Sequence, residues 1–297
     1  MNFKTSKITI LLLFAMLLLL PSNTASQEAT VVGNSKAIFN QYEEYITPYR
    51  SLTFETILEK TAQFFIGTPY VAHTLDREEK EQVVINLEAV DCVTFVENVL
   101  ALSLSAYSTD FSFKDFASHL QQIRYRNGEV LDYASRLHYT SDWIYENEQR
   151  NLVENISKQL SGKIEDKPIH FMSSNRSAYA QLATDNAMLH KIEQVENDIN
   201  QRGGFYYLPK GAIYSKEKEI PHMALIGFVT QIKGLDTTHV AFAYQNKDEL
   251  TLIHASSLVG KVIIDSSTLN NYCFSQKNCM GIIVAKINNL LVGRNKN

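Results

Sequence analysis

The sequence predicts an α+β fold, because helix-like patterns dominate its first part and strand-like patterns its last. Between positions 53 and 202, apolar residues recur at the three- and four-residue spacing of helices. After Gly203-Gly204 the chain changes to short runs rich in β-branched and aromatic residues, with turn residues between them. Helices followed by strands indicate a helical layer packed on one antiparallel sheet.

The first helix is expected over residues 53–65, where an apolar stripe ends before Gly67. The second begins at Asp91, whose carboxylate can cap it, and extends from Cys92 to about Ser105. This second segment is apolar on nearly all sides, as a buried central helix would be. We therefore expect it to pack against the sheet.

The remaining elements follow from the same patterns. Helices are expected near residues 113–125, 141–160 and 174–202, whereas residues 27–53 read as irregular surface chain. Strands are expected at residues 205–208, 224–230, 239–244, 250–255, 262–264 and 282–284. No linker-like stretch interrupts residues 27–297, which predicts one domain.

Residues 1–26 read as a secretory signal peptide. Lys4 and Lys7 precede an apolar stretch over residues 8–20, and the small residues Thr24-Ala25-Ser26 follow. The stretch is shorter than the ~20 residues of a membrane span, although an uncleaved anchor stays open as an alternative. We expect a secreted, periplasmic protein.

The composition narrows the function class. A net charge of −4 at pH 7 gives no support for binding nucleic acid or an anionic membrane surface. We expect a monomer that has no membrane contact once the signal is removed. The 15 Tyr and 15 Phe residues supply both a core and an aromatic-walled site.

Three cysteines are an odd number for an exported chain, and this flags one free thiol. Cys273 and Cys279 lie close in sequence and could pair, which would leave Cys92 unpaired. The alternative, that all three are small buried side chains, stays open. A thiol at the start of a helix is expected to have a lowered pKa.

Two histidines belong to the expected hairpin of strands 239–244 and 250–255. A two-residue loop at Asn246-Lys247 would place His239 directly opposite His254 on one face. A one-residue slip would separate them. This arrangement favours a relay in which Cys92 is the nucleophile, His239 the base and His254 the residue that orients His239.

A zinc site is the competing interpretation of these three residues. Cys92, His239 and His254 are all possible ligands. However, the chain shows none of the short His-x-x-His, Cys-x-x-Cys or Glu-x-x-His spacings that accompany zinc. We expect no metal and no other cofactor.

These motifs resemble the NlpC-type cell-wall cysteine peptidases, a papain-like superfamily. The matching motifs are Pro69-Tyr70, Asp91-Cys92, Thr238-His239-Val240-Ala241 and Ile253-His254-Ala255-Ser256. The blocks at 91–100, 136–143 and 234–239 resemble one branch, formerly a domain of unknown function, of N-acetylmuramoyl-L-alanine amidases acting on 1,6-anhydro-muropeptides. The resemblance spans most of residues 50–285. It implies a papain-like core with a mainly helical insertion between nucleophile and base.

The sequence departs from the commoner members at Val93-Thr94, where those read Ser-Gly, and after Pro69-Tyr70. Many of those members recognise a free L-Ala amine and cut the γ-D-glutamyl–diaminopimelate bond. An amidase that cuts the muramoyl–L-Ala bond meets no free amine, so the departure is consistent with the amidase function, and peptidoglycan fragments are the expected partners. An endopeptidase of the same fold and a non-catalytic muropeptide-binding protein are the alternatives.

The chemistry of single residues also suggests which of them lie around the substrate. Tyr70 is the candidate second oxyanion donor beside the Cys92 amide, and Asp91 adjoins the nucleophile. Other candidates for the substrate-binding walls are Arg136, His138, Trp143 and Tyr206, the last together with Tyr207 and Lys210. For Tyr70, Trp143 and Tyr206 a purely structural role stays open.

Overall fold

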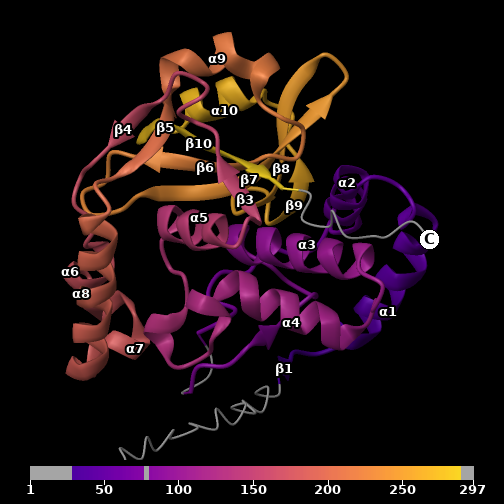
Figure 1. Cartoon of the computed structure of the whole chain (residues 1–297), viewed down its shortest axis with the longest axis horizontal. Coiled ribbons are helices and arrows are strands. Elements are labelled where there is room, and N and C mark those ends of the chain that lie inside the picture. Colours follow the sequence, from indigo (N-terminus) through magenta and orange to yellow (C-terminus); the bar gives the residue numbers. More distant parts are fainter. Residues whose placement is uncertain (1–28, 77–79, 289–297) are drawn as a thin grey trace, which may run out of the picture.

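The computed structural model describes residues 29–76 and 80–288, so the expected signal peptide at 1–26 lies outside the described residues. An eight-stranded antiparallel sheet forms the centre, with helices on both faces (Figure 1). This confirms the α+β prediction. In the described part of the chain, no helix is both long and apolar enough to cross a membrane.

The sheet collects strands from the second half of the chain in the order β4-β5-β10-β6-β7-β8-β9, and β3 also pairs with β10. The strands are β3 (Val153–Asn155), β4 (Lys163–Glu165), β5 (Phe205–Pro209), β6 (Leu225–Thr230), β7 (Thr237–Asn246), β8 (Glu249–Ser256), β9 (Lys261–Ile264) and β10 (Cys279–Ile287). A separate parallel pair joins β1 (Thr30–Val31) to β2 (Val84–Ile85).

Ten α-helices of the described residues surround this sheet. They are α1 (Ser35–Ile46), α2 (Phe54–Phe64), α3 (Cys92–Tyr107), α4 (Phe113–Arg124), α5 (Thr140–Gln149), α6 (Phe171–Ser174), α7 (Ala180–Ala183), α8 (Asn186–Gln201), α9 (Ile213–Lys216) and α10 (Leu269–Ser275). Helices α6 to α8 project to one side of the molecule (Figure 1).

Helix α3 is the central helix that the sequence predicts. Asp91 caps it by accepting a hydrogen bond from the Thr94 amide at 2.8 Å, and Thr94 Oγ1 accepts from the Asp91 amide at 2.8 Å. Its residues from Thr94 to Ala106 are all buried, and it packs on α2, α4, β7 and β8. This packing fixes the first turn of α3, and with it Cys92, relative to the sheet.

The two faces of the sheet bury different residues, as the strand period requires. On β7, Val240 and Phe242 join the core that contains α3. Ala241 and Ala243 point the other way, into a core that includes Ile213 of α9 and two residues of α10. Helices α9 and α10 therefore cover the face opposite α3 (Figure 1).

Several helix predictions are wrong in extent. The helix expected at 141–160 ends at Gln149, and Asn151 adopts a left-handed φ of 57° before the chain enters β3. The helix expected at 174–202 is continuous only as α8, where Asp185 accepts the capping hydrogen bond from Met188. Residues 27–53 contain α1, which buries Tyr42 and Ile46.

The predicted register of the histidine hairpin is also wrong, by two residues. Phe242 pairs with Ile253 and Asn246 with Glu249, so the loop is Lys247-Asp248. His254 therefore lies diagonal to His239 rather than directly opposite. A shift of two residues keeps every side chain on its face, so the histidines still meet.

Candidate active site

The nucleophile candidate Cys92 is the first residue of α3 and a free thiol. The backbone amide of Val240 interacts with this thiol, which places Cys92 beside β7, next to His239. No hydrogen bond joins the Cys92 and His239 side chains in the described structure. Catalytic hydrogen bonds of ligand-free enzymes are often long and shorten when substrate binds. The site thus holds a thiol next to the strand of its expected base.

The two histidines form a direct pair. His239 Nε2 lies 2.7 Å from His254 Nδ1, and the rings meet edge to face with centroids 4.9 Å apart. His254 is buried with 1 % exposure. The second ring nitrogen of His239, Nδ1, is left available for the thiol.

Asp265, directly after β9, completes the chain of hydrogen bonds. Its Oδ2 lies 3.2 Å from His254 Nε2 and its Oδ1 accepts from the Ser267 amide at 2.7 Å. An ionised carboxylate only accepts, so His254 Nε2 carries a proton and neutral His254 accepts at Nδ1. His239 must then donate from Nε2, which leaves Nδ1 bare. Asp265 therefore assigns the tautomers that make His239 a base.

Burial controls the charge state of this centre. It raises the pKa of the Cys92 thiol to about 12, and the Asp91 carboxylate adds to the rise. It also lowers the pKa of His239 to about 3, with a further contribution from His254. The sequence-based expectation of a lowered thiol pKa is wrong here, because desolvation outweighs the start of the helix. Both shifts favour a neutral thiol and a neutral imidazole.

Two tyrosines adjoin the thiol. Burial raises the pKa of Tyr70, and Cys92 and Asp91 raise it further, so the Tyr70 hydroxyl lies near the Cys92 thiol. Burial raises the pKa of Tyr272 to about 12, with contributions from Asp265 and Cys92. The Tyr272 ring packs 5.3 Å from the His254 ring and 6.0 Å from the His239 ring, measured between centroids.

The disulfide holds the segment that carries Tyr272. Cys273 of α10 is bonded to Cys279, the first residue of β10. The bond thus ties α10 to the sheet directly beside the ring that contacts both histidines. Cys92 is the remaining cysteine and is unpaired.

The other candidates near Cys92 have structural partners. Both the carboxylate and the amide of Asp91 serve the α3 cap. Arg136 is 5 % exposed, bonds Asp76 at 2.7 Å and lies over the Tyr133 ring at 4.8 Å. These contacts hold the Arg136 guanidinium within the protein, so it offers no exposed contact for a substrate.

Trp143 is buried and His138 is partly buried. They line a cavity of about 20 Å³ together with Val93 and Val240. That volume suits about one water molecule and no sugar ring. Trp143 is 4 % exposed, so its prediction as a stacking surface is wrong and it is a core residue. His138 lies 2.7 Å from the Tyr133 carbonyl oxygen through Nε2.

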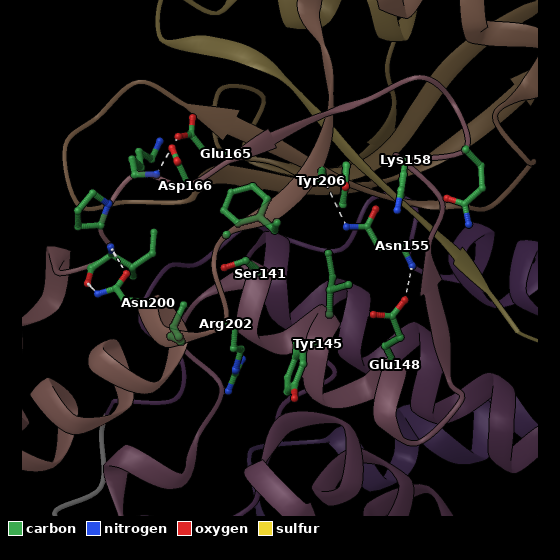
Figure 2. A pocket seen from close by; sticks show the side chains of 18 residues that line it. Ser141, Tyr145, Glu148, Asn155, Lys158, Glu165, Asp166, Asn200, Arg202 and Tyr206 are labelled. Carbon is green, nitrogen blue, oxygen red and sulfur yellow. Dashed lines mark hydrogen bonds between the residues drawn. The ribbon is translucent and has the colours of Figure 1, made fainter.

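The structure places Tyr206 on the wall of a different cavity, of about 480 Å³, which residues of α5 also line (Figure 2). Thr140 lines the small cavity near Cys92, and its neighbour Ser141 lines the large one. Neither Cys92 nor the two histidines line the large cavity. The prediction that Tyr206 faces the reacting centre is therefore wrong. Lys210 instead donates to the Phe274 carbonyl at 3.3 Å.

Sequence reasoning missed Asp265 and Tyr272. A signal for Asp265 existed, because Gly260 marks the turn of a hairpin between β8 and β9. That hairpin pairs His254 with Ile263, and the Asp265 amide donates to the Leu252 carbonyl at 2.8 Å. Asp265 is thereby diagonal to His254 on one face. Tyr272 gave no comparable signal, since α10 crosses the sheet and only tertiary packing brings its ring to the histidines.

The candidate site contains a thiol, two hydrogen-bonded imidazoles and a carboxylate, which lie in that order in space. Such a set can supply a nucleophile, a base and a carboxylate that orients the base. Among residues 29–76 and 80–288, no three His, Cys, Asp or Glu side chains converge in a way that could hold a metal ion. The arrangement supports acyl transfer through Cys92.

Comparison with known proteins identifies the family of this chain. No curated protein matches the chain. A solved N-acetylmuramoyl-L-alanine amidase from Bacteroides uniformis is 31 % identical, with a TM-score of 0.71 over 79 % of this chain and 99 % of that one. A Bacteroides fragilis protein classified provisionally as a xylanase is 33 % identical, with a TM-score of 0.72 over 76 % and 99 %.

A Legionella pneumophila protein shares the fold at 24 % identity, with a TM-score of 0.62 over 86 % of this chain and 97 % of that one. The family model described as N-acetylmuramoyl-L-alanine amidase-like matches residues 60–282. That range contains Cys92, both histidines and Asp265. The chain belongs to the N-acetylmuramoyl-L-alanine amidase-like family.

Proposed function

We propose that this protein is a cysteine-dependent amidase with a papain-like core that cuts the bond between N-acetylmuramic acid and L-Ala in peptidoglycan fragments. The observation that carries the proposal is the hydrogen-bonded chain from His239 through His254 to Asp265, set beside the Cys92 thiol. The Bacteroides uniformis amidase supports the choice of bond. The 1,6-anhydro sugar form is the expected substrate end.

In the proposed mechanism, Cys92 attacks the lactyl carbonyl that joins the sugar to L-Ala. His239 Nδ1 takes the thiol proton as the C–S bond forms, because both groups are neutral at rest. His254 and Asp265 stabilise the imidazolium that results. The Cys92 amide and the Tyr70 hydroxyl are the proposed donors to the oxyanion.

The second half of the reaction returns the enzyme to its resting state. The His239 imidazolium gives its proton to the departing L-Ala nitrogen, which leaves a thioester between Cys92 and the lactyl carbonyl. His239 then takes a proton from a water molecule that attacks this thioester. Free sugar acid leaves, and the Cys92 thiol is restored.

The carboxylates of this centre argue against glycoside hydrolysis, the reaction that the description of the Bacteroides fragilis protein names. Glycosidases generally place two carboxyl groups on either side of the scissile bond. Here Asp91 caps α3 and Asp265 accepts from His254 and Ser267. The shared fold alone does not decide between the two chemistries.

Export remains part of the proposal. The disulfide between Cys273 and Cys279 supports an oxidising compartment such as the periplasm, since such bonds are rare in reducing cytosol. Fractionation of cells that express the full chain, followed by immunoblotting, tests this. Recovery of unprocessed protein in the cytoplasm alone would contradict it.

The function is tested by mass spectrometry of a disaccharide anhydro-muropeptide incubated with the wild type and with Cys92→Ala. Ser118→Ala, an exposed position on α4, is the matched control. We expect free disaccharide and intact stem peptide from the wild type and the control, and no turnover by Cys92→Ala. Sugar still bearing L-Ala–D-Glu would assign the endopeptidase reaction instead. Turnover by Cys92→Ala would reject the thioester mechanism.

A further inference from the structure

The cavity of about 480 Å³ beside α5 contains none of the residues of the proposed reaction (Figure 2). It lies between α5, the end of α8, the start of β5 and the segment at 165–169. Its volume is within the range of sites that bind small molecules. Only the first turn of α5 separates it from the small cavity beside Cys92, because Thr140 and Ser141 line one cavity each.

Two tyrosines form opposite parts of its wall, and each is held by a cation. The Arg202 guanidinium lies 3.8 Å from the Tyr145 ring centroid and is itself fixed by a 2.6 Å bond to Asp142. The Lys158 ammonium lies 5.2 Å from the Tyr206 ring centroid. Lys158 and Arg202 line the same cavity, so each cation covers one face of its ring, and Figure 2 shows both rings on the cavity wall. The face of each ring that is turned away from its cation is the apolar surface that a ligand can contact.

The polar groups around these rings carry both signs. Lys158 and Arg202 contribute positive charge, whereas Glu148, Glu165 and Asp166 contribute negative charge. A site for phosphate or nucleic acid would instead gather cations. The mixture suits an uncharged ligand that has an apolar face and many hydroxyl or amide groups. A pyranose ring has both, since its C–H face packs on aromatic rings and its rim bonds to polar side chains.

We propose that this cavity is a saccharide-binding site. It holds a sugar ring of a cell-wall glycan while the Cys92 centre cleaves the bond between N-acetylmuramic acid and L-Ala. The identity of the glycan rests on the proposed function, but the capacity to bind sugar rests on Tyr145, Tyr206 and the mixed-charge rim. The site would retain glycan fragments on the enzyme from a position beside α5.

The test uses isothermal titration calorimetry of chitotriose, the β-1,4-linked N-acetylglucosamine trimer, on the full chain carrying Cys92→Ala. Tyr206→Ala and Tyr145→Ala are each expected to weaken binding by about tenfold or more, as removal of an anchoring aromatic does. Tyr214→Ala on α9, 76 % exposed and outside the cavity, is the matched control and should bind as the parent does. Tyr145 is 39 % exposed, so its truncation leaves the core intact if Tyr206→Ala fails to fold.

Absence of chitotriose binding to the parent, or equal affinity in both cavity variants, would overturn the proposal. The proposal would also be overturned if Tyr206→Ala weakened binding of the free stem peptide but left binding of chitotriose unchanged. Muropeptide cleavage by the wild type is measured separately. Cleavage without chitotriose binding would reject the saccharide site and keep the amidase, whereas binding without cleavage would reject the amidase and keep the site.

Discussion

Asp265 provides a direct test of how the histidine pair is set up for catalysis. In the wild type its carboxylate accepts from His254 at 3.2 Å and from the Ser267 amide at 2.7 Å, and it is 15 % exposed. In Asp265→Asn the side chain keeps one acceptor oxygen. If that oxygen serves Ser267, the amide nitrogen faces His254 and forces its Nε2 to accept.

The proton arrangement of the whole pair then reverses. His254 carries its proton on Nδ1, His239 must accept at Nε2, and His239 Nδ1 becomes protonated and cannot take the thiol proton. A hydrogen bond to a charged group contributes about 1.5–3 kcal/mol. Its loss corresponds to roughly a 10- to 150-fold decrease in kcat/KM. Asp265→Ala loses the same hydrogen bond and should show a decrease within this range, whereas Asp265→Asn should lose more because it also reverses the tautomer preference.

The assay is the initial rate of release of stem peptide from anhydro-muropeptide, followed by liquid chromatography at several substrate concentrations. Urea unfolding of each variant provides the control for folding. An Asp265→Asn enzyme at least as active as Asp265→Ala would refute the tautomer argument. A loss explained entirely by a lower unfolding free energy would refute it as well.

Three further predictions follow from the same structure. Because burial and Asp91 raise the pKa of the Cys92 thiol to about 12, iodoacetamide should alkylate it about tenfold faster for each pH unit above 7, and a plateau below pH 8 would contradict this. Burial lowers the pKa of His138 and of His239 to about 3, and Arg136 adds to the shift at His138 as His254 does at His239. The unfolded chain therefore takes up more protons than the folded chain as the pH falls below ~6.5. The unfolding free energy in urea should then fall by up to about 1.4 kcal/mol per pH unit for each residue, less steeply in His138→Gln, and a flat profile between pH 6.5 and 4 would argue against buried neutral imidazoles. Replacing Cys273 and Cys279 together by serine should lower the unfolding free energy by about 2 kcal/mol, since the bond spans a sequence separation of 6, and an unchanged urea midpoint would count against this contribution.

The elements that the sequence predicted well are those with a strong local cause. The start of α3 follows from Asp91 as a cap and from an apolar run long enough to be buried on every side. The two histidines were assigned to one face even though the register was off by two residues, because the side-chain period of a strand is two. The extent of the helix after Ser141 was not predictable in the same way, since pairing of β3 with β10 outweighs local helix preference.

Features that depend on long-range packing came from the tertiary structure alone. Desolvation of Cys92 reverses the direction of the pKa shift that a helix start implies, and no local pattern reports burial. Trp143 and Tyr206 looked alike as aromatic candidates, yet one lies in the core and the other lines a separate cavity. The sequence by itself determined the candidate nucleophile, the histidine pair and the α+β class, because each rests on local caps and periodicity. The tertiary structure decided the role of Asp265, the place of Tyr272 and the second cavity, because these depend on which distant segments the fold brings together.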